Sequence, residues 1–295
     1  MSDAQDKTAL PPRCSRWWLR LSLRGLLLAV TALAIGLGYI THRAREQERA
    51  VRFIERLGGR AVYDYQVGDP ETGRLPDGRP PGPQWLVRRI GPNFTGTVIA
   101  VDPFSVGEAS DQDLEVLRAL PKLRTFTLGG KNPKVSDEGL KRIGTLTRLK
   151  WLGLHRAGIT DEGLVHLKRL NNVAYLSLSG CNIHGSGLRH IQDLPIQMLD
   201  LNYTNLNADN LAHVTAMKSL SGLSFTNTLV TDDGLIQIRG LTNLQRLGFE
   251  ETTISDRGLV HLEGLTGLKE LGTYKTNVTK EGLAKLKRAL PELRD

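Results

Sequence analysis

The sequence has few of the residue types on which disulfide-rich or metal-dependent domains are built. Its 295 residues include two cysteines, Cys14 and Cys181, which are too few and too far apart for a disulfide framework or a thiolate zinc site. Aromatic residues make up only 5% of the chain. There is no P-loop, G-x-S-x-G, H-E-x-x-H, C-x-x-C or dinucleotide-binding motif. We therefore predict no catalytic residues, no cofactor and no metal site, and a protein that is not an enzyme.

The positive charge of the chain is unevenly distributed. The formal net charge of +8 comes from 39 Lys and Arg against 31 Asp and Glu. Residues 1–60 hold 11 basic and 5 acidic residues, whereas residues 123–295 hold 22 and 17. A nucleic-acid reader is expected to gather its basic residues on the folded domain. Because the excess here is densest around an apolar segment, we expect a membrane surface and no nucleic acid as a partner.

One apolar run, residues 25–41 (GLLLAVTALAIGLGYIT), contains no charged residue and follows a basic tail, residues 1–24. As a helix it would be about 25 Å long, slightly short of the roughly 30 Å hydrocarbon layer. Trp17 and Trp18 precede the run and Tyr39 lies near its end, where an aromatic belt would place them. The pattern predicts a single-pass transmembrane helix in contact with bilayer lipid.

Two other interpretations of this run are a buried core helix and a cleaved signal peptide. The second has an A-x-A match at Ala32-Leu33-Ala34, but the match lies inside the run, and cleavage there would leave residues 35–40 at a new N-terminus. We prefer an uncleaved anchor. Its orientation stays open, because five basic residues flank it on one side and six on the other; of the two, we favour an extracytoplasmic folded part.

Residues 42–96 read as a juxtamembrane region before the periodic part of the chain. A charged helix is predicted over residues 44–57, ended by Gly58-Gly59, and a strand over residues 61–65. Residues 66–83 are rich in Pro and Gly and read as a linker or extended loop. The apolar face expected on the helix consists of Ala50, Phe53, Ile54 and Leu57.

Residues 97–295 are periodic, and the period decides the expected fold. Two units read LKWLGLHRAGITDEGLVHLKRLNN and LSGLSFTNTLVTDDGLIQIRGLTN, and an irregular unit with a strand over residues 97–101 precedes the regular ones. Most neighbouring starts are 24 residues apart. The seven regular units begin at Leu123, Leu149, Val173, Ile196, Leu220, Leu244 and Leu268.

This pattern resembles the leucine-rich repeat family, and its [IV]-[ST]-D-x-G-L half is similar to the cysteine-containing subtype of about 24 residues. The whole layout also resembles membrane-anchored bacterial leucine-rich repeat proteins. The resemblance implies an α/β fold: a right-handed solenoid with a parallel concave sheet and short convex helices, preceded here by the transmembrane helix. Alternation along each strand agrees, because it places the last two leucines of L-x-x-L-x-L on one face.

Small polar residues recur in two further columns of the repeat. Ser136, Thr160, Thr231 and Ser255 are predicted helix N-caps, each followed by an aspartate that favours the positive end of the helix dipole. The Val173 unit has His184-Gly185 instead, so we expect a weaker cap there. A second column is expected to satisfy turn backbone groups, and Cys181 falls in it as a packed small residue; its other members are Thr204, Thr228, Thr252 and Thr276.

Histidines also recur at one repeat position. His166, His190, His213 and His261 each lie two residues after the helix leucine. Stacked units would make a metal-binding ladder geometrically feasible, but no carboxylate repeats with them. We prefer a repeat consensus inherited by duplication.

The third position of each unit carries the candidate binding residues. Trp151, Tyr175 and Met198 are predicted to stand side by side on the concave face, above a groove of small residues. The expected border of this patch is His155, Arg156, Asn202 and Tyr203, and the face turns charged toward the C-terminus.

We interpret the chain as a non-enzymatic module that binds a protein or peptide through its concave face. Aromatic residues with Met and Arg are enriched at interface centres, although such side chains also cover backbone without a ligand. The alternatives are an adaptor that recruits substrate to an enzyme complex and an envelope structural protein without a specific ligand.

The anchor can be tested by charge substitution. Replacing Leu28 and Ile35 with Asp should release the protein from membranes, because each central charge costs about 2.5–3.5 kcal/mol on insertion scales. Fractionation of membranes by flotation measures this. A wild-type protein that remains soluble, or a mature N-terminus near Ile35, would contradict the anchor.

Overall fold

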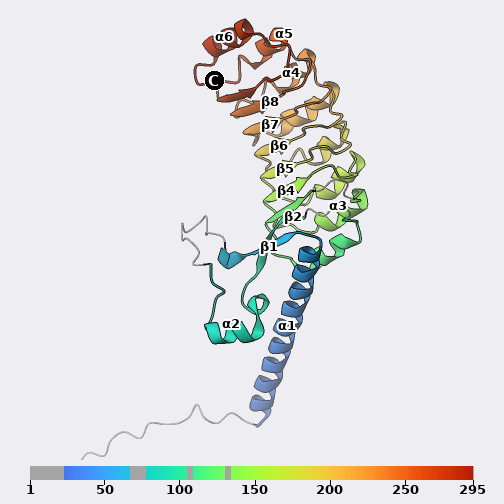
Figure 1. Ribbon diagram of the computed structural model, residues 1–295, viewed down its shortest axis with the longest axis vertical. Helices are drawn as coiled ribbons and strands as arrows, with labels where there is room; N and C mark the ends of the chain where they lie inside the picture. The colour runs from blue at the N-terminus through green and yellow to red at the C-terminus, as the bar shows by residue number, and fades with distance from the viewer. Residues whose placement is uncertain (1–22, 67–77, 105–108, 130–133, 295) are drawn as a thin grey trace, which may run out of the picture. The chain divides into compact units, whose positions relative to one another are not determined.

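The computed structural model describes residues 23–66, 78–104, 109–129 and 134–294. Cys14, Trp17, Trp18 and almost all of the basic tail therefore lie outside the described residues. The chain divides into two compact units, Met1–Arg43 and Ala44–Asp295. Figure 1 shows the second unit as a stack of strands with helices along one side.

The helix α1 runs without interruption from Leu23 to Arg56 (Leu23–Arg56). Two helices were predicted here, one over residues 25–41 and one over residues 44–57; the structure joins them, because no Gly or Pro separates them and the linking residues are polar helix formers. In the first unit the apolar side chains of α1 are exposed, including Leu28 and Ile35. By length and hydropathy α1 is long and apolar enough to cross a membrane, a test that a signal sequence also passes.

The second half of α1 belongs to the N-terminal cap of the solenoid. It buries the face formed by Ala44, Gln47, Ala50, Val51 and Ile54, with Phe53 and Leu57 packed beside it. The amide of Gln47 is 5% exposed, donates to the carbonyl of Gly96 at 3.0 Å and accepts from the backbone N–H of Val98 at 3.3 Å. These bonds tie α1 to the first strand of the repeat array, as a capping element must.

Nine strands form one sheet in sequence order (Figure 1). β1 pairs antiparallel with β2 and covers the edge of the sheet, and every later pair is parallel. The strand expected at residues 61–65 starts and ends earlier, because the backbone turns into a 3₁₀ helix at Asp64. The strands are β1 (Arg60–Tyr63), β2 (Val98–Phe104), β3 (Thr125–Leu128), β4 (Trp151–Leu154), β5 (Tyr175–Ser177), β6 (Met198–Asp200), β7 (Gly222–Ser224), β8 (Arg246–Gly248) and β9 (Glu270–Gly272).

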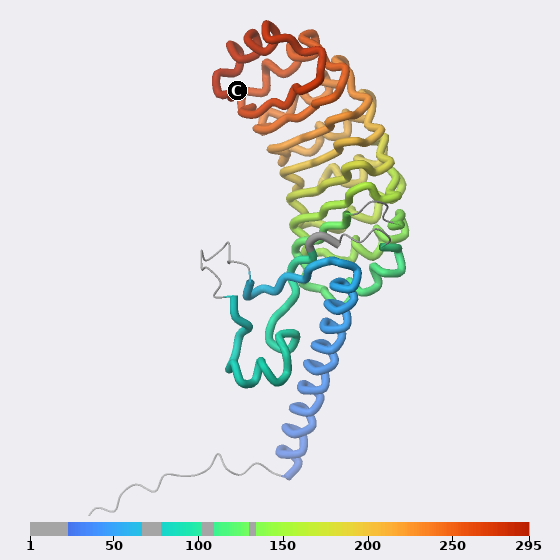
Figure 2. The backbone as a smooth tube through the Cα atoms, in the orientation of Figure 1, coloured from blue at the N-terminus to red at the C-terminus, as the bar shows by residue number. Residues whose placement is uncertain are grey.

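The repeat register predicted from the leucines is confirmed. Within the Leu149 unit the side chains of Leu152, Leu154, Leu164 and Leu167 are at most 1% exposed. Equivalent positions of the other units join them in one continuous core that begins at α1 and ends at Leu293. Figure 2 shows the units as successive turns of a curved solenoid, with the strands on its inner side. The core closes at its C-terminal end through the buried Leu286, Leu290 and Leu293.

Several of the expected convex helices are 3₁₀ rather than α-helical. A 3₁₀ helix rises about 2.0 Å per residue against 1.5 Å, so it spans the same gap with fewer residues. The α-helices are α2 (Gln84–Ile90), α3 (Asp137–Ile143), α4 (Asp232–Ile238), α5 (Asp256–Leu259) and α6 (Lys280–Ala289). The 3₁₀ helices are η2 (Asp64–Gln66), η3 (Pro92–Phe94), η4 (Asp113–Ala119), η5 (Glu162–Leu167), η6 (Ser186–His190), η7 (Asp209–Ala216) and η8 (Val260–Leu262). The helix α2 was not predicted.

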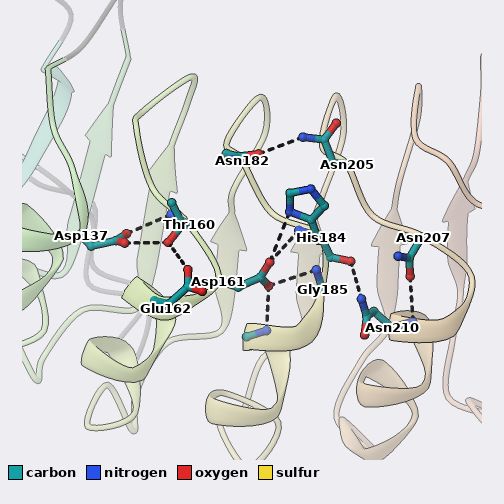
Figure 3. A network of polar contacts seen from close by, with 11 residues as sticks. Asp137, Thr160, Asp161, Glu162, Asn182, His184, Gly185, Asn205, Asn207 and Asn210 are labelled. Carbon is teal, nitrogen blue, oxygen red and sulfur yellow. Dashed lines mark hydrogen bonds and ion pairs between the residues drawn. The ribbon is translucent and has the colours of Figure 1, made fainter.

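The repeat aspartates link each unit to the next one. The carboxylate of Asp137 accepts from the backbone N–H of Thr160 at 2.9 Å and from its hydroxyl at 2.7 Å (Figure 3). Asp232 and Asp256 bind Ser255 and Thr279 in the same two-pronged way. The prediction that these aspartates lie at helix N-termini thus missed a more specific role, since each one fixes the following unit.

These contacts between the aspartate of one unit and the hydroxyl and N–H of the next, here called the aspartate ladder, decide which of the predicted N-caps form. Ser136 and Ser255 do cap their helices, each accepting from the N–H two residues on. Thr160 was predicted wrongly as a cap, because its hydroxyl donates to Asp137 and Glu162 and η5 begins two residues later. Thr231 occupies the cap position, but its side chain makes no capping hydrogen bond.

The ladder also explains the glycine of the D-x-G-L motif. A Cβ placed on Gly163 would overlap the carboxylate of Asp137, and one on Gly282 would overlap that of Asp256. Where the aspartate is replaced by Gly185, the following unit carries Asn210 in place of glycine, and a Cβ on Gly185 would lie 2.7 Å from the Cβ of Asn210. Aspartate and glycine in neighbouring units are therefore a matched pair.

The cap of the Val173 unit is weak, as predicted, and the preceding unit compensates for it. Gly185 stands at the start of η6 with φ of 108° and has no side chain to cap it. Instead Asp161 accepts from the N–H groups of His184, Gly185 and Gly187 at 2.7–3.0 Å (Figure 3).

The threonine column behaves as the sequence predicted. Each hydroxyl donates at 2.7 Å to the carbonyl three residues earlier, which would otherwise lack a partner in the turn. Cys181 occupies the same column and contacts the carbonyl of Leu154 at 3.5 Å.

The matched pair predicts a specific stability pattern. Gly163→Ala should cost about 1–3 kcal/mol of unfolding free energy, as overpacking does, because the new methyl meets Asp137. Asp137→Ala combined with Gly163→Ala should cost less than the sum of the single changes. Urea unfolding measures both.

Gly240→Ala is the matched control, because nothing lies within 4 Å of its Cβ position. It should change stability by no more than about 0.5 kcal/mol. Strict additivity of the Asp137 and Gly163 changes would contradict the pairing.

Candidate interaction site on the strand face

The parallel register places the third residues of the units in one row. Trp151 pairs with Tyr175, which pairs with Met198, and the row continues through Gly222 to Arg246. Neighbouring strands lie about 4.8 Å apart, so side chains in a row must touch or leave a gap set by their size. The side-by-side arrangement predicted for the three large residues follows from this pairing.

Trp151 and Tyr175 form a stacked aromatic pair. Their ring centroids are 3.5 Å apart and the ring planes differ by 7°. Trp151 is 43% exposed, while Tyr175 is half-buried between Trp151 and the neighbouring unit. Burial, with a smaller contribution from Asp200, raises the pKa of Tyr175 above the usual value for a tyrosine. The pair presents a flat, rigid apolar surface that is open to solvent.

Met198 continues this surface over the next strand. A Cβ on Gly222 would overlap the Met198 side chain, so the methionine lies across the glycine of β7. An unbranched thioether adapts to irregular partners more readily than a branched side chain. Glycine at the third position of β7 therefore sets where the apolar part of the row ends.

The four predicted border residues are not equally close to the patch. Asn202 lies on the same face, and His155 Nδ1 lies 3.5 Å from the Ser177 hydroxyl. Arg156 and Tyr203 are exposed at the edge, where both have left-handed backbone, with φ of 55° and 57°. Their N–H groups donate to the following unit at 2.8 Å, which extends the backbone ladder beyond the strands.

The left-handed position recurs in every unit after the first, and sequence reasoning missed it. The eighth residue has positive φ whether it is a glycine or not, at a cost of roughly 1–2 kcal/mol for a residue with a Cβ. Gly180 and Asn227 could have indicated the left-handed backbone from the sequence, because glycine and asparagine tolerate that conformation best. The column consists of Arg156, Gly180, Tyr203, Asn227, Glu251 and Lys275.

A hollow of about 510 Å³ opens beside the aromatic pair, over strands β5–β9. It starts at Tyr175 and Met198 and extends toward the C-terminus, where Arg294 lines its far end. The small residues Gly248 and Gly272 form its floor, as the groove of small residues predicted. Arg294 was not predicted, because its place beside β9 depends on a backbone bond from its N–H to the Lys269 carbonyl at 2.8 Å.

Hydroxyl groups of one unit hold acceptors of a neighbouring unit along this floor. The Ser177 hydroxyl donates to Asp200 at 2.7 Å, that of Ser224 to the Asn202 side-chain oxygen at 2.6 Å, and that of Thr226 to Glu250 at 2.5 Å. Asp200, Asn202 and Glu250 are thereby fixed in one orientation. Charges of both signs line the hollow, namely Asp200, Glu250 and Glu270 with Arg246 and Arg294.

A salt bridge stands at the edge of the hollow. Lys275 Nζ donates to Glu251 Oε1 at 2.8 Å, and Asn227 donates to the other carboxylate oxygen at 2.9 Å. These bonds, with that from Lys275 the larger, lower the pKa of Glu251, and Glu251 raises the pKa of Lys275. Because Lys275 is exposed and the Glu251 side chain is 29% exposed, the pair positions the edge more than it stabilises the fold.

The histidine column lies on the helix side of the units, away from the strand residues. His166, His190, His213 and His261 are all half-buried. Among the described residues, no group of three or more His, Cys, Asp or Glu has an arrangement that could hold a metal ion. The predicted absence of a metal site and of catalytic residues stays a prediction.

Comparison with known proteins matches this chain to solved structures. No family model and no curated protein matches the chain. Internalin C2 of Listeria monocytogenes is 26% identical, with a TM-score of 0.47, and the match covers 61% of this chain and 71% of that one. The plant peptide hormone receptor RGFR1, in complex with RGF2, is 21% identical, with a TM-score of 0.42 and coverage of 64% of this chain and 30% of the receptor.

Both matches are partial, so the repeat architecture rests on this chain's own units. Strand, turn and buried leucine recur in register from β3 to β9. The folded unit is therefore an α/β solenoid of leucine-containing repeats.

The burial of the Cys181 thiol predicts that it resists alkylation in the folded protein. Cys181 is 2% exposed, and burial raises its pKa to about 12, so it stays protonated at pH 8. In a Cys14→Ser variant, iodoacetamide should not modify the folded protein at pH 8 but should modify it in denaturant. Modification of folded protein at the rate of a free thiol, read by mass spectrometry, would show that Cys181 is not packed as described.

Proposed function

We propose that this protein is a membrane-anchored, non-enzymatic interaction module that binds a protein or peptide through the strand face of its solenoid. The observation that carries the proposal is the stacked, solvent-open pair Trp151–Tyr175 at the edge of a 510 Å³ hollow. Exposed Trp and Tyr beside Met and Arg are the composition of interface centres. A hollow of this size is in the range of pockets that enclose a ligand or several side chains.

The rigidity of the surface supports a binding role. Trp151, Tyr175 and Met198 project from in-register strands, and the acceptors on the floor are held by hydroxyls of the neighbouring units. Side chains that are ordered before binding lose little conformational entropy when a partner arrives. A face that only covered backbone would not need its polar groups fixed across units.

The two ends of the surface indicate the chemistry of the partner. The Trp151–Met198 end is apolar, whereas Asp200, Glu250, Glu270, Arg246 and Arg294 give the hollow charges of both signs. A protein segment can offer an apolar side chain beside charges of either sign. A nucleic-acid backbone would be repelled by the three carboxylates, which favours a protein or peptide.

The anchor is supported by the same helix that caps the solenoid. Side chains of α1 from Leu23 to Ile40 are exposed, and an 18-residue window has a mean hydropathy of 1.9. Such a surface needs lipid to cover it. Cleavage at the A-x-A match would leave residues 35–40 exposed and still attached to the cap, which favours an uncleaved span.

The two alternative functions have less support. An adaptor needs a partnering domain outside the repeats, and residues 42–96 were the only candidate; most of the described part of that region, including Gln47 and Ile54, serves as the solenoid cap. A structural protein without a ligand predicts a featureless inner face, whereas this face has an aromatic pair and a hollow.

The proposal predicts that Trp151 and Tyr175 contribute much of the binding free energy. Trp151→Ala combined with Tyr175→Ala should weaken partner binding by at least about 1–2 kcal/mol, or roughly fivefold to thirtyfold, because the partner loses its apolar platform. Binding of purified full-length protein in detergent, measured by interferometry, checks this.

Leu229→Ala is the control, because this exposed apolar side chain lies outside the hollow and its affinity effect should be absent. Melting temperatures of both variants should stay near that of the wild type. Unchanged affinity in the Trp151, Tyr175 double variant would rule out this face as the binding surface.

A further inference from the structure

The segment between β1 and β2 leaves the sheet and carries the short helix α2 (Figure 1). Residues 78–97 (GRPPGPQWLVRRIGPNFTGT) contain three arginines and no Asp or Glu. Within α2, Val87 is buried. The helix lies outside the strand pairing, which joins β1 directly to β2.

Trp85, Arg88 and Arg89 share one face of α2. They stand at i, i+3 and i+4, which are neighbouring positions on a helix surface. Trp85 is 70% exposed, and both arginines are exposed as well. Val87, two residues from Trp85, lies on the opposite side of the helix and is buried. The helix thus presents an unpaired indole and two guanidinium groups to its surroundings.

The chain just after α2 is held to α1 by a hydrogen bond. Asn93, three residues after α2, accepts from the Gln47 amide at 3.2 Å and from the Tyr63 hydroxyl at 2.8 Å. Gln47 follows Thr41, the last residue of the apolar run, by six positions. Six residues of helix cover about 9 Å, and six extended residues cover at most about 20 Å. Asn93, and with it the C-terminal end of α2 three residues earlier, is therefore held near Gln47, which the chain keeps within about 9–20 Å of the end of the apolar run.

We propose that α2 is a second membrane contact, in which Trp85 lies among the phospholipid headgroups and Arg88 and Arg89 bind their phosphates. This inference rests on the proposed anchor, because the apolar run brings α2 to the bilayer. Trp is the residue most suited to the headgroup region, since its ring is apolar and its N–H is polar. Arginine pairs with phosphate through two parallel hydrogen bonds. The occupant is the bilayer that holds α1, chosen for the positive charge of the segment and its tether.

Attachment at two points has a consequence for binding. A single helix lets the solenoid swivel about the membrane, whereas a helix and a lateral contact limit that rotation. The strand face would then meet partners from a restricted set of directions.

Depth-dependent fluorescence quenching tests the contact on full-length protein in vesicles of phosphatidylcholine and phosphatidylglycerol. One variant keeps Trp85 as its sole tryptophan (Trp17→Phe, Trp18→Phe, Trp151→Phe), and a matched variant keeps only Trp151 (Trp17→Phe, Trp18→Phe, Trp85→Phe). A lipid spin label near the headgroup should quench Trp85 severalfold more than Trp151. Arg88→Glu with Arg89→Glu should reduce the quenching of Trp85, and Arg239→Glu, on the helix side of the repeats, should not.

The outcomes separate this inference from the anchor on which it rests. Vesicles that float with the protein while Trp85 is quenched no more than Trp151 would overturn the α2 contact and leave the anchor intact. The same holds if Trp85 is shielded from iodide but not quenched by lipid, which would indicate a protein or a second copy on α2. Protein that does not float with vesicles would overturn both.

Discussion

Every unit of this solenoid can bury its leucines only against its neighbours, so the in-register stacking of the units is the constraint on which the structure depends. The leucine core alone would tolerate small slips, because apolar contacts are not directional. The aspartates remove that freedom: Asp137, Asp232 and Asp256 each bind both a hydroxyl and an N–H of the next unit. The glycine that accommodates each carboxylate makes the fit specific. Strand residues then fall into straight columns, and the row of Trp151, Tyr175 and Met198 is one consequence.

Most of the architecture could be predicted from the sequence, because each repeat unit has the same pattern of buried and exposed residues. Register, buried leucines, the threonine column and the alignment of the patch all follow from a period of about 24 residues. The sequence could not predict contacts between units that depart from the repeat pattern. Gly185 and Asn210 are visible in the sequence as two separate departures from the repeat pattern. Only the structure shows that a Cβ on Gly185 would meet the Cβ of Asn210. Arg294 and α2 lie outside the period and gave no repeat signal.

The break in the aspartate ladder lies beside the candidate site. Gly185 and Ala208 replace aspartate in the two units that supply Tyr175 and Met198 to the strand face. The Asp161 carboxylate and the Asn207 and Asn210 side chains supply other polar contacts there (Figure 3). The units whose convex edge departs most from the repeat pattern are therefore the same units that place Tyr175 and Met198 on the strand face.

The N-terminal cap connects the proposed membrane attachment to the proposed binding face. One helix carries the exposed apolar surface at one end and, at the other, buries Ala50, Val51 and Ile54 in the solenoid core. Its Gln47 bonds both to the first repeat strand and to the segment of α2.

Site-directed photo-cross-linking measures the central claim most directly. A photoreactive residue at Arg246, on the strand face, should cross-link a single protein species in membranes of the source cells, and the cross-link should be lost in the Trp151→Ala, Tyr175→Ala background. The same residue at Arg239, on the helix side, should give no such product. Cross-linking that is equal at both positions, or confined to Arg239, would contradict recognition by the strand face.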